Sequence, residues 1–185
     1  MKIALLNIFI LLSSSLIFVA PSEARDESNC VYTIYVKTGS IIKAGTDSKI
    51  TLELYNKKGD GVRITDIENW GGLMGQNYDY FERSNLDVFS GRGPCLDEPV
   101  CAIKLISDGS GPHHGWYVNY IDITTTGPHL GCAKVKFDVE QWLASDAPPY
   151  ELSAIRDYCP RDGLNVEGGT RSIQEVPSLK SISTI

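Results

Sequence analysis

The chain has 185 residues, a formal net charge of -6 and five cysteines, and hydrophobic residues make up 42% of it. That apolar content is typical of a globular chain and argues against a largely disordered one. The length is typical of a single domain. The acidic balance, without any run of Lys and Arg, argues against a function in nucleic-acid binding.

Residues 1–24 have the plan of a secretory signal peptide. Lys2 supplies a positive start, residues 3–19 are mostly apolar, and residues 22–24 place small side chains at the -3 and -1 positions of a cleavage site. The apolar stretch is short for a membrane span of about 20 residues. We therefore expect a mature chain that begins near Arg25, has no transmembrane segment and enters the secretory pathway.

Alternating apolar residues predict strands along most of the remaining chain. The runs with this pattern lie near residues 31–37, 49–55, 86–88, 103–105, 116–121, 135–139 and 150–154. Residues 56–61 are typical of a hairpin loop, because their glycines can adopt positive φ. We expect an all-β fold with about eight antiparallel strands in two packed four-stranded sheets, since an isolated sheet would leave an apolar face in water.

With the strands assigned in this way, the chain divides into a signal peptide, a sandwich domain and a tail. The sandwich domain is expected to cover residues 28–156, following the signal peptide. Residues 157–185 form the third part. Within it, residues 161–185 are rich in Ser, Gly and charge, and Pro177 interrupts a weak three-residue apolar repeat. This composition predicts a mobile tail.

All five cysteines lie in the expected mature chain, and secretion favours disulfide bonds. Cys95 and Cys101 enclose a short loop, so a local bond between them is the first prediction. Cys30 and Cys159 lie at the two ends of the strand pattern, and a bond between them would close a long loop. Cys132 then has no partner and is either a buried free thiol or an intermolecular link.

Four segments in order resemble the PLAT family, also called the lipoxygenase-homology domain family. They are residues 32–50, 81–89, 107–118 and 137–143. Residues 113–120 and 141–146 more narrowly resemble the small secreted plant PLAT proteins that are associated with stress responses. The resemblance implies a β-sandwich of the PLAT type that acts as a non-catalytic module for contact with a protein or a lipid surface. It also implies a contribution to abiotic-stress tolerance. The signal peptide predicts a location in the apoplast or the endoplasmic reticulum lumen, and we expect a monomer.

Two other classes of function compete with a binding module. Ser110, His113 and Asp108 lie too close along one loop to form the geometry of a catalytic triad. A hydrolase is therefore the weakest alternative, and we expect no required cofactor. A lipid carrier with a pocket between the two sheets is the stronger alternative, and a filled interior would argue against it.

Calcium is the metal that the residues favour. Gly45, Thr46 and Asp47 lie in one predicted loop, Asp60 in the next and Asp108 in a Gly-rich loop. Calcium takes six to eight oxygen ligands from loops of this kind, and the resemblance adds that some PLAT domains bind calcium at one end of the sandwich. The competing interpretation is turn chemistry, because Asp side chains also bond to their own backbone.

A Gly-rich segment supplies the candidate contact surface. Trp70, Leu73, Met74 and Tyr78 are apolar or aromatic residues in or beside it. Such side chains suit insertion into a lipid interface or contact with a protein partner. The competing interpretation is that Trp70 and Leu73 close the end of the hydrophobic core.

Overall fold

The computed structural model describes residues 29–128, 130–160 and 181–185. The predicted signal peptide and most of the predicted tail lie outside these residues. The elements are β1 (Asn29–Thr38), β2 (Ile50–Tyr55), β3 (Asp60–Ile64), α1 (Ile67–Gly71), β4 (Leu86–Pro94), β5 (Ala102–Ser107), β6 (Trp116–Gly127), β7 (Leu130–Leu143), β8 (Ser153–Asp157) and β9 (Ser181–Thr184).

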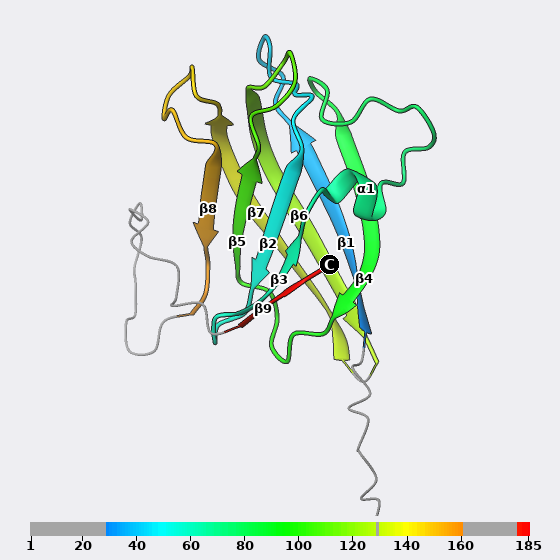
Figure 1. Cartoon of the computed structure of the whole chain (residues 1–185). Coiled ribbons are helices and arrows are strands. Elements are labelled where there is room, and N and C mark those ends of the chain that lie inside the picture. The colour runs from blue at the N-terminus through cyan, green and yellow to red at the C-terminus, as the bar shows by residue number, and fades with distance from the viewer. Residues whose placement is uncertain (1–28, 129, 161–180) are drawn as a thin grey trace, which may run out of the picture.

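The strands form two sheets that pack face to face (Figure 1). One sheet has the order β4-β1-β6-β7, and the other has the order β8-β5-β2-β3-β9. Pairing among β1 to β8 is antiparallel throughout. The predicted all-β sandwich of two four-stranded antiparallel sheets is therefore confirmed. The second sheet gains a ninth strand, β9, which the sequence pattern did not predict and which runs parallel to β3.

The space between the sheets is filled by side chains that alternate along the strands. Five large or branched residues from both sheets are fully buried, namely Tyr32, Ile34, Leu52, Val118 and Phe137. Successive strand residues point to opposite faces, so this alternation carries one residue in two into the core. The packing therefore offers no support for a lipid carrier with a pocket between the sheets.

Two disulfides join Cys30 to Cys95 and Cys101 to Cys159. The four bonded cysteines are those expected, but the predicted pairs are wrong. The pairing follows strand register: β1 lies beside β4, which ends directly before Cys95. In the same way, β5 begins directly after Cys101 and lies beside β8, which ends two residues before Cys159. Neighbours in space, not neighbours along the chain, therefore form the bonds.

Cys132 is a free cysteine on β7, and its side chain is exposed. The predicted alternative of a buried thiol is therefore wrong. The intermolecular link remains a prediction. Elsewhere in the described residues, no helix combines the length and the apolar character needed to cross a bilayer.

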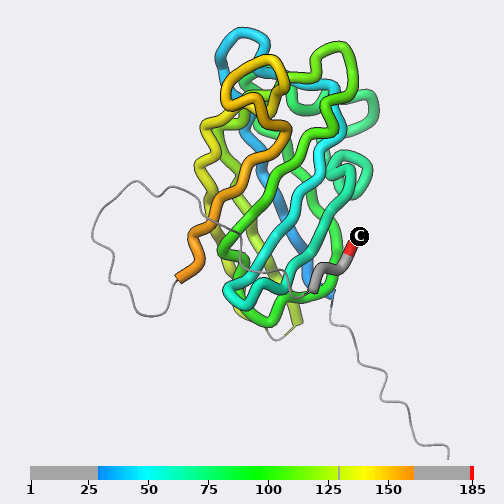
Figure 2. Tube along the Cα trace, turned by 60° about the vertical axis from the view of Figure 1, so that its left-hand side comes forward, coloured from blue at the N-terminus to red at the C-terminus, as the bar shows by residue number. Residues whose placement is uncertain are grey.

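The two ends of the sandwich differ in construction (Figure 2). Both disulfides lie at one end, which we call the disulfide end. The loops 39–49, 65–85, 108–115 and 144–152 lie together at the opposite end, which we call the loop end. The second of these loops contains the short helix α1.

Candidate functional site

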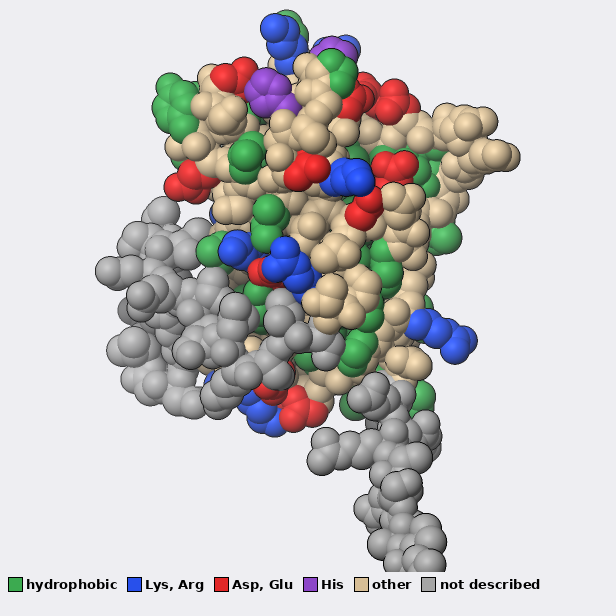
Figure 3. Space-filling model, in the orientation of Figure 1, with side chains coloured by type: hydrophobic (Ala, Val, Ile, Leu, Met, Phe, Trp, Pro, Cys, Tyr) green, Lys and Arg blue, Asp and Glu red, His purple; other side chains and the backbone are tan. Residues whose placement is uncertain are grey.

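A groove with a volume of about 960 Å³ opens at the loop end. Residues from all four loops form its walls, and Figure 3 shows histidine and acidic side chains gathered on this end of the molecule. Its lining mixes apolar side chains, histidines and charges of both signs. The charged lining residues are Lys43, Asp47, Asp79, Glu82, Arg83 and Asp146.

Three of these acidic residues form a compact cluster. Asp47, Asp79 and Glu82 each offer a carboxylate oxygen, and these oxygens all lie within 4.8 Å of one another. We call this group the acidic cluster. Of these three residues, the sequence predicts only Asp47 as a ligand, since Asp79 and Glu82 come from a different loop.

Gly45 and Thr46, both on the loop 39–49, have different structural roles. Gly45 lines the groove, and a Cβ at this position would lie 3.1 Å from the backbone nitrogen of Arg83. Thr46 is buried, and its Oγ1 accepts a hydrogen bond from the backbone nitrogen of Ser48 at 3.1 Å. Thr46 therefore holds its own turn, as the competing interpretation of this segment proposed.

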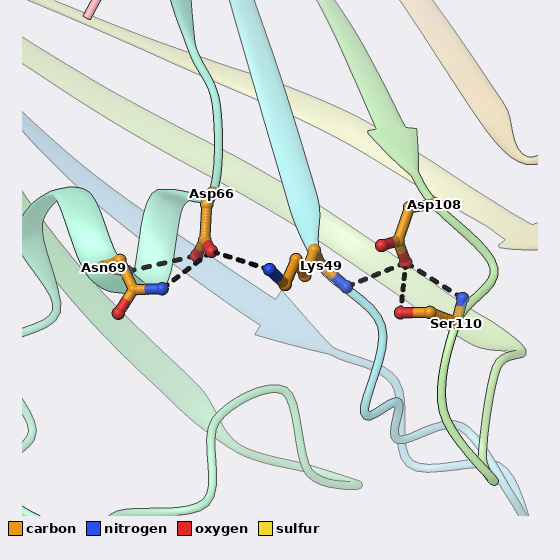
Figure 4. Close-up of polar contacts among 5 residues, drawn as sticks. All are labelled: Lys49, Asp66, Asn69, Asp108 and Ser110. Atoms are coloured by element: carbon orange, nitrogen blue, oxygen red, sulfur yellow. Dashed lines mark hydrogen bonds and ion pairs between the residues drawn. The ribbon is translucent and has the colours of Figure 1, made fainter.

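Asp108 is engaged in a similar turn at the loop end (Figure 4). Its Oδ1 accepts hydrogen bonds from the backbone nitrogens of Lys49 and Ser110 at 3.0 and 2.9 Å, and from the Ser110 hydroxyl at 2.7 Å. Lys49 also reaches Asp66, with 3.9 Å between Nζ and Oδ2. Asp60 begins β3 at the disulfide end, beside a separate small pocket. The structure therefore does not bring Asp60 or Asp108 into the acidic cluster.

A buried carboxylate shapes the loop that carries Asp79 and Glu82. Phe81 has a φ of 58°, in the left-handed region that side chains other than glycine rarely adopt. Its backbone nitrogen donates to Oδ2 of Asp87 at 2.8 Å, and Asp87 is fully buried. Oδ1 of Asp87 has no hydrogen-bond partner among the described residues. Asp87 is therefore a positioning residue, which holds the turn that brings Glu82 towards Asp47.

The Asp87→Asn variant is expected to gain stability relative to the wild type as the pH rises. Burial raises the pKa of the Asp87 carboxyl, and hydrogen bonds from Phe81 and Tyr78 offset this only in part. A carboxyl with a higher pKa in the folded chain binds more protons there. It therefore destabilises the fold progressively as the pH climbs from the unfolded value of about 3.9 through the folded value. Urea unfolding of both proteins at a series of pH values measures this, and a pH-independent difference would contradict it.

The histidines of the groove pair with carboxylates. His113 Nδ1 lies 3.0 Å from Oδ2 of Asp47, and His114 Nε2 lies 3.5 Å from Oδ1 of Asp146. The Ser110 hydroxyl donates to Asp108, as described above. A catalytic triad requires the serine to face the histidine, so this arrangement does not support a hydrolase.

The predicted contact residues divide into two groups. The ring of Trp70, on α1, packs against β4 and the core, and Tyr78 is also partly buried against the core. Leu73 and Met74 project from the same loop, with 59% and 36% of their surface exposed. Ile42, on the loop 39–49, is 79% exposed and was not singled out in the sequence. Ile41 and Tyr150, on the loops 39–49 and 144–152, are also exposed. Ile42, Leu73 and Met74 are therefore among the apolar side chains available for contact at this end.

Together, the fold and the site define a β-sandwich module that presents a groove and apolar loop residues at one end. Comparison with known proteins gives the family. The model of the PLAT/LH2 domain matches residues 32–154. The chain belongs to the PLAT/LH2 domain family, which confirms the resemblance recognised in the sequence.

Two plant proteins agree with this assignment. The chain is 60% identical to PLAT domain-containing protein 2 of Arabidopsis thaliana over 141 residues, which are 76% of this chain and 77% of that protein. It is 57% identical to PLAT domain-containing protein 1 of the same plant over 163 residues, which are 86% and 89% of the two chains. A solved structure of a calcium-dependent 11R-lipoxygenase shares 20% identity over 68% of this chain and 17% of that chain, with a TM-score of 0.48.

Proposed function

We propose that this PLAT-domain chain is a non-catalytic module that docks on a lipid surface through its loop end. The observation that carries the proposal is the position of three exposed apolar side chains, Ile42, Leu73 and Met74, on the same end as the acidic cluster. Apolar side chains on loops can enter the interfacial zone of a bilayer without disturbing the sandwich. The strands behind them form a rigid support.

Calcium fits the acidic cluster by donor chemistry. Calcium prefers oxygen ligands and takes six to eight of them, and carboxylate oxygens of Asp47, Asp79 and Glu82 converge within 4.8 Å. These three residues would hold the ion, which would supply positive charge at the loop end. A net charge of -6 otherwise repels anionic headgroups. The proposal therefore includes calcium-assisted docking.

Co-sedimentation with vesicles of phosphatidylcholine and anionic phosphatidylserine tests docking and its calcium requirement together. We expect a larger fraction of the protein to sediment in about 1 mM calcium than in a chelator, because extracellular calcium sites typically bind in the range of about 0.1–1 mM. The triple variant Asp47→Asn, Asp79→Asn, Glu82→Gln should lose the calcium-dependent part. Isothermal titration with calcium alone measures the binding of the ion without lipid.

Asp60→Asn is the matched control, because Asp60 lies at the disulfide end. Its calcium response should equal that of the wild type. Docking that is equal in calcium and in chelator would remove calcium from the proposal, and an absence of sedimentation under both conditions would overturn docking on lipid.

The two disulfides suggest an oxidising, secretory-type environment. Together with the signal-peptide pattern of residues 1–24, they support a location in the secretory pathway, in the apoplast or in the endoplasmic reticulum lumen. The likeness to small plant PLAT proteins supports a contribution to abiotic-stress tolerance. Both statements form part of the proposal.

A further inference from the structure

The outer edge of the second sheet is covered by a segment from the far end of the sequence. Ser181–Thr184 forms β9 and pairs in parallel with β3, in the register Asp60 with Ser181 to Arg63 with Thr184. Figure 1 shows β9 alongside β3, at the side of the sandwich where β3 faces β4. Among the strands that the structure describes, this pair is parallel and the other pairs are antiparallel.

Backbone hydrogen bonds continue the pairing beyond β9. The Ile185 nitrogen donates to the Arg63 carbonyl at 3.0 Å, and the Thr65 nitrogen donates to the Ile185 carbonyl at 3.4 Å. An edge strand with free N–H and C=O groups accepts an extended peptide in this manner, and main-chain bonds then supply affinity without regard to sequence. Residues 181–185 therefore pair with the edge of β3 in the way that a bound extended peptide pairs with an open sheet edge.

A side-chain socket accompanies the backbone pairing. Ile185 is partly buried and packs against the hydrophobic core. It lies over Gly93 of β4, where an added Cβ would come within 2.5 Å of Ile185 Cδ1. The same Cβ position is 3.5 Å from Tyr32 and 3.7 Å from Val62, so these core residues border the socket. Ile185 therefore bridges β3 of one sheet and β4 of the other.

The opposite side of the sandwich is closed in a different way. There Arg156 of β8 donates from Nε to the Asp138 carbonyl at 3.0 Å and from Nη2 to the Val139 carbonyl, which joins β8 to β7 of the other sheet. Both carbonyls belong to β7, which has 14 residues, while β8 has five. β9 has four residues and is connected through residues 160–180 to Cys159, which the second disulfide anchors. The hydrogen bonds of so short a strand stabilise it by little more than the free energy that is lost when its residues become ordered.

We propose that the β3 edge and the socket over Gly93 form a peptide-binding site, which residues 181–185 occupy within the same chain. The ligand class is an extended peptide of a partner protein with a β-branched apolar residue at the socket position. The parallel pairing sets the direction of that peptide, and the missing side chain at Gly93 sets its preference for a branched aliphatic residue. Release of the chain's own segment makes the site available. This site is separate from the loop end and does not depend on the proposed function.

Fluorescence anisotropy with a labelled peptide that reproduces residues 177–185 tests the site. Ile185→Asp and the milder Ile185→Ser remove the anchoring side chain but leave β3 and the socket intact. Both variants should bind the probe about tenfold or more tightly than the wild type, because apparent affinity falls with the fraction of sites that are open. Adding Gly93→Ala to either variant places a methyl group in the socket and should weaken this binding.

Hydrogen exchange at the Thr65 amide gives a second, independent readout on the full chain. Its exchange should rise in both Ile185 variants, because its acceptor in the wild type is the Ile185 carbonyl. Unchanged exchange at Thr65 would overturn the occupancy of the edge by residues 181–185. Failure of both released variants to bind the probe would overturn the peptide-binding site, and equal binding with and without Ala at position 93 would overturn the socket.

Discussion

Replacement of Cys30 and Cys95 together by serine is expected to lower the free energy of unfolding by about 4 kcal/mol. The bond joins residues 65 positions apart, and in the chain-entropy model the unfolded state gains the freedom of the whole loop when the bond is removed. In the folded protein the same bond ties β1 to the segment that follows β4. Urea unfolding without reductant measures the change.

Cys132→Ser is the control for that experiment, since Cys132 is exposed and free. Its unfolding free energy should match that of the wild type. Mass spectrometry of a non-reduced digest should recover Cys30 joined to Cys95. A peptide pair linking Cys95 to Cys101 would contradict the pairing, and wild-type stability in the double serine variant would contradict its energetic role.

Trp70→Ser and Leu73→Ser are expected to separate stability from docking, although the two residues are only three positions apart in the sequence. Trp70 packs against β4 and the core, so its replacement should lower the free energy of unfolding by about 2–3 kcal/mol. Leu73 is 59% exposed, and its replacement should change that quantity by less than about 0.5 kcal/mol.

Vesicle binding should show the reverse order. Burial of a leucine side chain contributes about 1.5–3 kcal/mol, so Leu73→Ser should weaken docking about tenfold or more. Trp70→Ser should dock as the wild type does at temperatures where it remains folded. Equal docking by Leu73→Ser and the wild type would remove Leu73 from the contact surface, and wild-type stability in Trp70→Ser would place Trp70 outside the core.

The strands could be predicted because each has one buried face. In β1, Tyr32, Ile34 and Val36 are buried while the residues between them are partly exposed, and this two-residue period is visible in the sequence alone. The pattern does not specify which strands become neighbours. The cysteine pairs depend on that arrangement, and for this reason the local prediction of Cys95 with Cys101 was wrong.

The candidate site could be predicted only in part, for a related reason. Asp47 was identified because its loop carries turn residues between two clear strands. Asp79 and Glu82 join it from another loop, and their approach depends on the left-handed turn at Phe81 that the buried Asp87 holds. Asp79 and Glu82 flank Tyr80 and Phe81, and this aromatic pair predicts an apolar contact surface, not a metal site.

β9 was missed because its residues were interpreted with the weak three-residue repeat of residues 173–182. Residues 173–180 lie outside the described part of the chain. For residues 181–185, pairing depends on the open edge of β3 and on the space above Gly93, neither of which is local to the segment. A short strand that is stabilised mainly by pairing with a strand distant in the sequence shows little strand pattern in its own residues.

The concentration of both covalent bonds at the disulfide end has a practical consequence for engineering. The strand ladders and the disulfides are complete without the tips of the loops at the opposite end, where insertions and exchanges are usually tolerated. Residues around Ile42 and Leu73 could therefore be randomised in a library while the framework is preserved. Such a framework would suit the display of new recognition sequences in oxidising media.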